Sequence, residues 1–590
     1  MSTFRKVSLL LTPGQRKGVL VLLALVLVGI VLETAGIGMV VPAVALLTRS
    51  DLASSYPRLQ PILTFLGNPT QAWLVTGGMV GLVLIFLIKN LFLAYFAWWQ
   101  NRFADGVQIH LAQRLFATYL RQPYTFHLQR NSAQLIRNVN NEVVTFQGTL
   151  LNFISLLTEG GALVGITALL IAVEPLAAAI VVLLVGLTAL MFHRTTRRHL
   201  ARWGELRLHH VGLSTQHLMQ GLGGVKDIKL LGREDDFLEQ FGAHLTQGAR
   251  MTRYYNTLLV IPRMWLELLA VTGLATLVLT MVAQGRDMAS IVPALALFGA
   301  AAFRFMPAVN KMLGAMQGLR FSRPAIDVIF EELQLAAPVP ARRGTGAQSS
   351  FQREISLTNV TYTYPAAPAP ALRDVTLTVQ KGESVGFIGP SGSGKSTLVD
   401  IVLVLLSPSA GQVSVDGRNV EQHQREWQDQ IGYVPQFIYL TDDTLRRNVA
   451  FGLSDTHIDD AAVERAIRAA QMEEFVASLP GGLETIVGER GVRLSGGQRQ
   501  RIGIARALYH DPTVLVLDEA TSALDAAIEC DVMEAVTALK GSKTILIVAH
   551  RPSTLEQCDR LYRLEHGRIV EAGIPGTMLH RRARVTQPQA

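Results

Sequence analysis

Six long apolar segments in the first half of the chain constrain its fold more than any other feature. They lie near 18–47, 74–98, 147–172, 176–192, 257–283 and 289–316. About 20 apolar residues are the length that a helix needs to cross the hydrocarbon of a bilayer. The first segment is too long for a signal-peptide core and lacks a small-residue cleavage site, so we expect it to remain as an anchor. The sequence therefore predicts an all-α transmembrane domain of six helices over 1–336.

The composition and the placement of charge agree with a membrane protein. Of 590 residues, 49% are hydrophobic and only 17% are charged, which excludes an ordinary soluble enzyme. The net charge is +8, and many arginines flank the apolar segments, as in 102–138 and 194–207. Arginine-rich loops stay in the cytosol, so both termini are predicted to be cytosolic, and no nucleic-acid partner is expected. Two cysteines, Cys530 and Cys558, are too few for a disulfide framework or a zinc site.

The connections between the apolar segments differ on the two sides of the membrane. Two cytosolic connections, 103–146 and 193–256, are rich in helix-forming residues. We expect the membrane helices to continue through them and to reverse at short crossing helices near 126–137 and 209–221. In the outer connection, 51–73, leucine and isoleucine recur at helical spacing, which fits a short amphipathic helix or a small packed loop.

Several ionisable side chains lie within or beside the apolar segments, where a charge is costly. Arg263 and Glu267 are four residues apart, so an ion pair within one helix would explain both. Arg304 and Lys311 are seven residues apart and fall on one helix face. Together with Lys89, they predict either a cationic cavity for an anionic head group or side chains that extend to the membrane surface. The candidate head-group residues are Lys89, Arg263, Arg304 and Lys311.

The last part of the chain has a different pattern. Residues 337–350, rich in Pro, Ala, Arg, Gly and Ser, mark a linker. From 351 to 574, strands alternate first with turns and then with helices, which predicts an α/β domain with an antiparallel edge. Residues 575–590 are expected to form a basic, disordered tail.

A glycine-rich loop in this domain follows an expected strand, 384–388, and opens an expected helix, 396–405. It consists of Gly389, Pro390, Ser391, Gly392, Ser393, Gly394, Lys395, Ser396 and Thr397. Glycines let backbone N–H groups approach phosphates, and a helix N-terminus favours their negative charge. We expect Lys395 to reach the outer phosphates and the Ser396 hydroxyl to ligate Mg²⁺. The pattern therefore predicts a P-loop nucleotide-binding domain.

Other polar residues follow the expected strands of the same domain. Asp518 and Glu519 end an apolar strand, where Asp518 would hold Mg²⁺ and Glu519 would act on the attacking water. Gln436 would contact Mg²⁺ and water, and His550 would contact the γ-phosphate. Tyr364 precedes the loop by a distance that would let its ring stack on adenine, although a core tyrosine explains it as well.

A run between the phosphate loop and Asp518 resembles the signature of ABC transporters: Leu494, Ser495, Gly496, Gly497 and Gln498. Residues 487–491 and 522–525 resemble two further elements of the exporters in that family, the second of which ends at Asp525, in its dimer-contact loop. The resemblance covers essentially the whole chain. It implies ATP and Mg²⁺ as cofactors, a bacterial cytoplasmic membrane, and a homodimer with two ATPs at its interface. Ser495 and Gly497 of one copy would close over the phosphate that Lys395 of the other holds.

Two stretches, 131–139 and 303–311, look similar to bacterial Pgl-type flippases. Those proteins move polyprenyl-diphosphate-linked oligosaccharides from the inner to the outer leaflet, and a diphosphate would suit the cations Lys89, Arg304 and Lys311. The leading expectation is a flippase of a lipid-linked oligosaccharide. The alternatives are an ABC exporter of another lipid of the lipid A type or of amphipathic drugs, and a membrane-anchored ATPase that regulates a partner.

Overall fold

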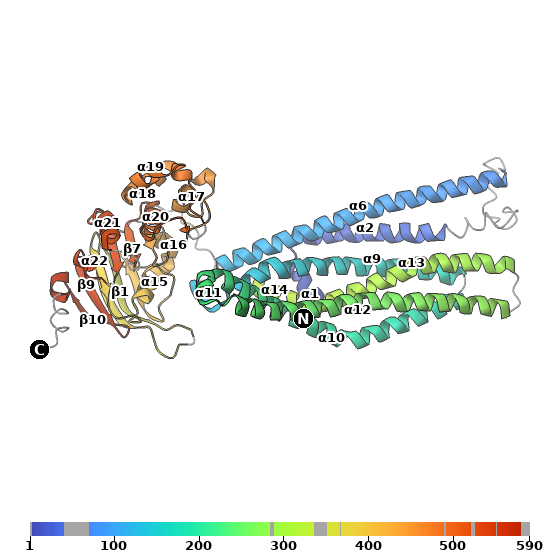
Figure 1. Ribbon diagram of the computed structural model, residues 1–590. Coiled ribbons are helices and arrows are strands. Elements are labelled where there is room, and N and C mark those ends of the chain that lie inside the picture. The colour runs from blue at the N-terminus through green and yellow to red at the C-terminus, as the bar shows by residue number, and fades with distance from the viewer. Residues whose placement is uncertain are drawn as a thin grey trace. The chain divides into compact units, whose positions relative to one another are not determined.

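The computed structural model describes most of the chain, as two compact units (Figure 1). The first unit comprises Met1–Gln122 and Gln129–Ala337, and the second comprises Pro123–Leu128 and Pro338–Ala590. The described residues are 3–39, 70–173, 175–283, 288–335, 351–365, 367–488, 491–520, 526–549 and 551–579. Outside them lie the predicted linker, most of the outer connection 51–73, the tail beyond 579, Asp525 and His550. The side chain of Arg304 is likewise not described.

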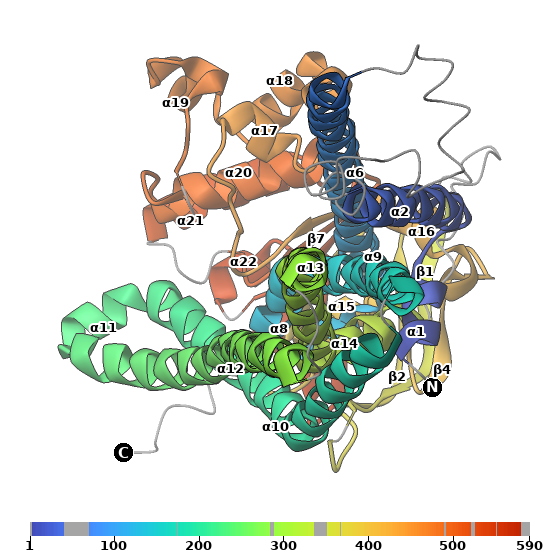
Figure 2. The same cartoon turned by 90° about the vertical axis from the view of Figure 1, so that its right-hand side faces the viewer.

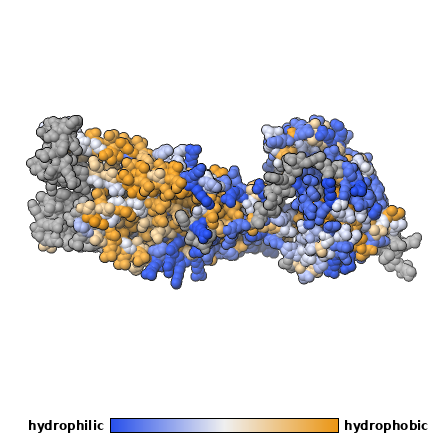
Figure 3. All heavy atoms as spheres, turned by 180° about the vertical axis from the view of Figure 1, so that it is seen from behind, coloured by the Kyte–Doolittle hydropathy of each residue, from blue (hydrophilic) through white to orange (hydrophobic). Residues whose placement is uncertain are grey.

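Long helices build the first unit, as the apolar segments predict (Figure 2). The six that carry the expected spans are α2 (Pro13–Gly38), α6 (Gln71–Leu120), α9 (Val143–Val173), α10 (Pro175–Gly223), α12 (Glu234–Ala283) and α13 (Met288–Phe321). Within the described residues, four stretches are long and apolar enough to cross a membrane: Pro13–Gly38, Val75–Leu120, Ser132–Leu169 and Glu234–Thr276. The two other predicted spans fall on α10 and α13, which include residues whose side chains are not described. On the face that Figure 3 shows, an apolar band covers part of this unit.

Close packing of α2 against α9 depends on two glycines four residues apart. A Cβ atom added at Gly161 would lie 2.1 Å from Cδ1 of Ile30, and one at Gly165 would lie 2.2 Å from Oγ1 of Thr34. Small residues at this spacing allow membrane helices to approach closely. The start of α2 is set by a capping box, in which Thr12 and Gln15 exchange hydrogen bonds.

The membrane helices continue past the apolar segments, as expected, but one of the two crossing helices lies elsewhere. α10 runs on to Gly223, and the reversal to α12 is made by α11 (Val225–Leu231), so the prediction of a crossing at 209–221 is wrong. Gly232, at φ +62°, ends α11 in the left-handed conformation that glycine adopts readily. The other reversal contains two short helices, α7 (Tyr124–Gln129) and α8 (Ser132–Arg137), where the sequence predicted one.

Short elements complete the first unit. A π-helical turn, η2 (Asn138–Glu142), joins α8 to α9. α1 (Thr3–Leu10) packs against α14 (Arg323–Gln334), and Lys6 pairs there with Asp327. Neither α1 nor α14 was predicted from the sequence, because neither is apolar enough to register as a membrane segment.

Two sheets form the second unit and confirm the predicted α/β class with antiparallel strands. The antiparallel sheet has the order β2-β1-β4-β5, and the other sheet has the order β10-β9-β3-β8-β7-β6. In the latter, all neighbours are parallel except β9 and β10. The strands are β1 (Glu354–Tyr362), β2 (Leu372–Gln380), β3 (Ser384–Ile388), β4 (Ala410–Val415), β5 (Arg418–Asn419), β6 (Ile431–Val434), β7 (Val514–Asp518), β8 (Thr544–Val548), β9 (Arg560–Glu565) and β10 (Arg568–Gly573).

Helices surround these sheets. They are α15 (Lys395–Val402), α16 (Gln424–Gln428), α17 (Leu445–Val449), α18 (Asp460–Ala469), α19 (Glu473–Ser478), α20 (Gly496–Leu508), α21 (Ala526–Thr537) and α22 (Pro552–Glu556), with short 3₁₀ turns at Val420–His423, Asp455–His457 and Gly482–Glu484. Strands β7 and β8 are buried along their whole length, which matches their continuous apolar sequences. The carboxyl ends of β3, β6 and β7 therefore meet at one edge of the parallel sheet, and the nucleotide motifs follow those ends.

Candidate functional sites

The phosphate loop has the strand–loop–helix geometry that its sequence predicts. Gly392 and Gly394 have φ values of +77° and +103°, which side chains disfavour, and a Cβ at Gly394 would lie 2.8 Å from Ala371 O. Lys395 Nζ donates to the carbonyl oxygens of Gly389 and Pro390, both at 3.0 Å. The loop therefore wraps around its own lysine, at the N-terminus of α15.

Lys395 is buried beside two carboxylates. Burial lowers the pKa of its ammonium group, while the negative charges of Glu519 and Asp518 raise it. The hydroxyl of Ser393 in the same loop is buried and has no hydrogen-bond partner among the described residues. Ser396 and Thr397 lie in the first turn of α15. A phosphate oxygen would satisfy the orphaned hydroxyl, so the loop fits the nucleotide that the motif implies.

Asp518 and Glu519, at the end of β7, have different environments. Asp518 is 9% exposed, and its Oδ1 atom has no hydrogen-bond partner within the described part of the chain. Burial, and then the charge of Glu519, raise the pKa of Asp518, whereas Lys395 and Tyr433 lower it. An orphaned, buried carboxylate oxygen is a suitable ligand for Mg²⁺. The residues present therefore fit the metal that the motif implies.

Glu519 turns away from the strand. Its φ of +48° is in the left-handed region, and its backbone N–H donates to Val548 O at 2.9 Å. Gln436 Nε2 donates to Glu519 Oε2 at 2.7 Å, so the structure brings together two residues that the sequence assigned to the attacking water. Strain of this kind is found where a side chain must be aimed.

Two residues of this site were missed in the sequence. Asp400, on α15, has a pKa raised to about 6 by burial and then by the charge of Asp518. Tyr433, on β6, has a raised pKa, first from burial and then from the charges of Asp518 and Asp400. Asp400 follows the phosphate loop by one helical turn, and Tyr433 precedes Gln436 by three residues. These fixed distances along the sequence from known motif residues could have identified both residues.

Tyr364 lies close to the phosphate loop. Its hydroxyl is 3.1 Å from Oγ1 of Thr397, and its ring meets that of Tyr362 edge to face at 5.0 Å. Stacking on adenine remains a prediction.

The signature residues begin α20 (Gly496–Leu508), whose first residue is Gly496. Ser495 caps this helix: Gln498 N–H donates to Ser495 Oγ at 3.2 Å, and Ser495 N–H donates to Gln498 Oε1 at 2.8 Å. Within the described residues of one chain, no hydrogen bond joins the signature to the phosphate loop. The free N-terminal end of α20 can therefore attract an anion from elsewhere.

Three of the four predicted head-group residues, those whose side chains are described, have partners in the membrane unit. Lys311 Nζ donates to Glu159 Oε1 at 3.0 Å, across α13 and α9, with the Glu159 side chain 7% exposed and that of Lys311 61% exposed. Arg263 donates to Glu267 at 2.9 Å, which confirms the expected ion pair within one helix. Lys89 Nζ lies 4.4 Å from the ring centroid of Phe86. The sequence did not predict the partner of Lys311.

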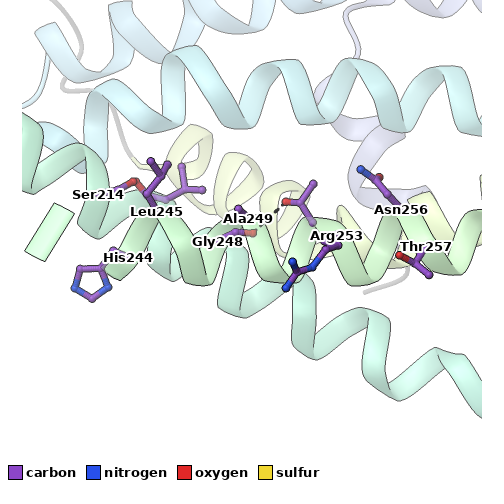
Figure 4. A pocket seen from close by; sticks show the side chains of 10 residues that line it. Ser214, His244, Leu245, Gly248, Ala249, Arg253, Asn256 and Thr257 are labelled. Carbon is purple, nitrogen blue, oxygen red and sulfur yellow. Dashed lines mark hydrogen bonds between the residues drawn. The ribbon is translucent and has the colours of Figure 1, made fainter. Parts of the chain in front are cut away.

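A separate pocket of about 460 Å³ lies along α10 and α12 (Figure 4). Its polar lining includes Ser214, His244, Arg253 and Asn256. None of the residues predicted from the sequence to bind nucleotide or head group lines it. The pocket is therefore distinct from both candidate sites.

Comparison with known proteins agrees with this combination of units. Residues 372–522 match the family described as ABC transporter, and residues 55–303 match the ABC transporter transmembrane region. The chain is 30% identical over 520 residues to the ATP-dependent lipid A-core flippase of Ralstonia nicotianae, covering 87% of this chain and 86% of that protein. It is 32% identical over 535 residues to the protein of the same description from Alkalilimnicola ehrlichii, covering 87% of each.

A solved structure has the same fold. The structure of a bacterial Atm1-family ABC exporter with ATP bound matches with a TM-score of 0.79 and 23% identity, covering 98% of this chain and 99% of that one. Membrane-crossing helices followed by a P-loop ATPase define the class of ATP-driven transporters.

The chain belongs to the ABC transporter family, as a half-transporter of the exporter type. It is a multi-pass membrane protein that hydrolyses ATP, with Mg²⁺, to drive transport.

Proposed function

We propose that this chain is one half of a homodimeric flippase that uses ATP to move a phosphorylated glycolipid of the lipid A type. The lipid would pass from the inner to the outer leaflet of the bacterial cytoplasmic membrane. The observation that carries the proposal is the similarity to lipid A-core flippases, which extends over 87% of the chain. The polyprenyl-diphosphate-linked oligosaccharide that the sequence favoured has weaker support, because it rests on two short stretches.

The nucleotide chemistry follows from the residues at the end of the parallel sheet. Mg²⁺, when bound, would neutralise phosphate charge, and the Ser396 hydroxyl and the orphaned oxygen of Asp518 would hold it. Glu519, held by Gln436, would accept a proton from the attacking water. Tyr364 would lie against adenine, and His550 would contact the γ-phosphate.

A second copy would complete each site. The capped start of α20, with Ser495, Gly496, Gly497 and Gln498, has no hydrogen bond to its own phosphate loop among the described residues, so we propose that it closes over the ATP held by the other copy. Asp525 would lie at the contact between the two copies. Closing and reopening of this dimer would move the membrane helices between two conformations.

In the membrane unit, the ion pair of Lys311 and Glu159 supports an anionic head group. A phosphate could replace the Glu159 carboxylate as the partner of Lys311, since both are oxyanions that accept hydrogen bonds from an ammonium group. Lys89 and Arg304 remain proposed contributors. Arg263 already has Glu267 as a partner, and its side chain is 71% exposed, which makes it the weakest of the four candidates.

Reconstitution tests the transported lipid directly. Liposomes would contain the purified protein and one labelled lipid, either a lipid A glycolipid or a polyprenyl-diphosphate oligosaccharide, with a leaflet-specific quencher as the readout. We expect ATP to move the lipid A glycolipid, and Glu519→Gln to lower the rate by about 10²-fold or more, because the general base is lost. Movement of the oligosaccharide alone would overturn the lipid A proposal in favour of the first expectation. Movement of lipid A at an equal rate by Glu519→Gln would overturn the role of Glu519.

A further inference from the structure

A cluster of cations lies where the apolar parts of two membrane helices end. The apolar stretch of α10 ends near residue 192 and that of α13 near residue 316. Beyond these points the helices carry Arg194, Arg197 and Arg198 on α10 and Arg320 on α13. The two helices pack closely there, since a Cβ atom added at Gly204 would lie 2.2 Å from Phe321 O.

Arg320 and His193 join the two helices. Nη2 of Arg320 donates to Nε2 of His193 at 2.8 Å, so the imidazole accepts with a lone pair and is neutral in this contact. A neutral partner leaves the charge of Arg320 uncompensated. Burial lowers the pKa of Arg320, and the neighbouring guanidinium groups of Arg197 and Arg323 lower it further. The two neighbouring charges that shift the pKa of Arg320 are therefore both positive.

Carboxylates do not neutralise this cluster. Among the described residues, Arg194, Arg197, Arg198 and Arg320 form no ion pair with an acid. Asp327, the acid of α14 that is nearest in sequence to Arg323, already pairs with Lys6 and lies 3.7 Å from Arg323, and Glu332 of the same helix pairs with Arg130. Like charges that are held close together near a protein surface repel one another. Exposed arginines that follow a membrane helix are ordinary, but a half-buried arginine bonded to a neutral histidine points to a missing anion.

The level of the cluster identifies that anion. Aromatic side chains follow it along the same helices. Phe321 comes directly after Arg320 and its ring lies 4.3 Å from that of Tyr255, and the rings of Trp203 and Tyr254 lie 5.4 Å apart. Trp and Tyr favour the membrane–water boundary. At this boundary the abundant anions are the phosphates of lipid head groups. Arginine binds phosphate with two parallel hydrogen bonds, which a single lysine cannot do.

We propose that His193, Arg197 and Arg320, with Arg194 and Arg198 at the edge, form a binding site for the phosphate of a lipid head group in the cytosolic leaflet. The site holds a lipid from outside the helices and is distinct from Lys311 within the span. It does not depend on which lipid is transported. The phosphate can belong to a bilayer phospholipid or to a phosphorylated glycolipid.

Lipid binding to the purified full-length protein, without ATP, tests the proposal. Native mass spectrometry would give the affinities for phosphatidylglycerol, phosphatidylcholine and lipid A in wild type and in Arg197→Gln/Arg320→Gln. We expect this variant to bind phosphatidylglycerol, lipid A or both at least about tenfold more weakly, because two charge-assisted contacts are lost. Phosphatidylcholine binding should not change, because its choline cation offsets the phosphate. If only the affinity for lipid A falls, the bound phosphate belongs to the glycolipid. If the affinities for lipid A and phosphatidylglycerol both fall, the site binds the anionic lipids of the leaflet in general.

The matched control removes the same charge elsewhere. Arg233→Gln/Arg465→Gln changes two arginines that are each 65% exposed, one directly before α12 and one on α18. This control should bind all three lipids as wild type does.

A second cluster variant, Arg194→Gln/Arg198→Gln, changes only exposed side chains, so it tests the site if the first variant does not fold. It should lower the affinity for phosphatidylglycerol or lipid A by about threefold. Wild-type affinity for both anionic lipids in either cluster variant would overturn the proposal. Because no transport is measured, failure of the flippase assay would leave this result intact.

Discussion

Three carboxylates, those of Asp400, Asp518 and Glu519, lie around the phosphate loop, and burial and then the charge of Asp518 raise the pKa of Asp400 to about 6. Asp518 and Glu519 could be predicted, because they are adjacent at the end of an apolar strand and must point in different directions. Asp400 could not, because its approach to Asp518 depends on how α15 packs on β7. The hydrogen bond from Gln436 to Glu519 could not be predicted from the sequence either, because 83 residues separate the two positions.

Asp400 should make the stability of the nucleotide-free protein depend on pH. Its pKa is about 6 in the folded protein, above the ordinary 3.8, so folding favours its protonated form. That contribution is fully present below about pH 4 and is lost as the pH rises through about 6. We therefore expect Asp400→Asn to gain stability relative to wild type between pH 5 and pH 7, as measured by the thermal unfolding midpoint of the ATPase unit.

The control for this experiment is Asp511→Asn, which removes a carboxylate that is 88% exposed. The difference between Asp511→Asn and wild type should stay level over the same pH range. An Asp400→Asn curve parallel to that of wild type would show that the Asp400 carboxylate is not perturbed by burial.

At the scale of elements, the length of an apolar segment predicts where a membrane helix lies. It does not predict where the chain reverses between two helices or which side chains pack between them. The crossing helix α11 was misplaced because the sequence from 193 to 223 keeps a helical pattern without interruption, and the break comes only at Gly223 and Gly224. The π-turn η2 was also missed. It holds the buried Glu142, whose Oε2 accepts from Arg207 Nη2 at 3.2 Å across to α10. Such a pair depends on tertiary contact, which one sequence does not show.

The contact between α2 and α9 can be tested with neighbouring glycines of one helix. Gly165→Leu should push Oγ1 of Thr34 away and destabilise the membrane unit by about 1–3 kcal/mol, as overpacking does. Gly160→Leu makes the same change on α9 at a site with no atom within 4 Å, so it should be tolerated. The thermal unfolding midpoint of each purified variant checks this, and equal midpoints for the two would contradict the packing.

For the whole molecule, the motifs predicted a two-domain transporter correctly, and the lipid was the weakest inference. The ATPase residues form a dense pattern whose spacing is set by phosphate chemistry. The head-group residues are single cations spread over three helices, and at least two of them have acidic partners that lie on the same helix or across a helix contact. A pattern so sparse does not identify a substrate.

The proposed sharing of each ATP site between two copies predicts how mixed dimers should behave. Lys395→Ala disables a phosphate loop, and Ser495→Arg disables the start of α20. When the changes are in different chains of a tagged heterodimer, one composite site keeps both intact parts, so ATP hydrolysis should persist. When both changes are in one chain beside a wild-type chain, each site has one damaged part, and hydrolysis should fall to background. The reverse pattern would mean that each chain hydrolyses ATP alone.

The cap of α20 leaves Ser495 well prepared for an incoming triphosphate. A hydroxyl group has one hydrogen to give and two lone pairs, and the bond from Gln498 N–H occupies only a lone pair. The hydrogen stays available, and a hydroxyl that already accepts a bond becomes a better donor through polarisation. In the proposed dimer, closing of the two copies would thus add a contact at Ser495 without breaking one, and the helix would stay intact through every round of ATP hydrolysis.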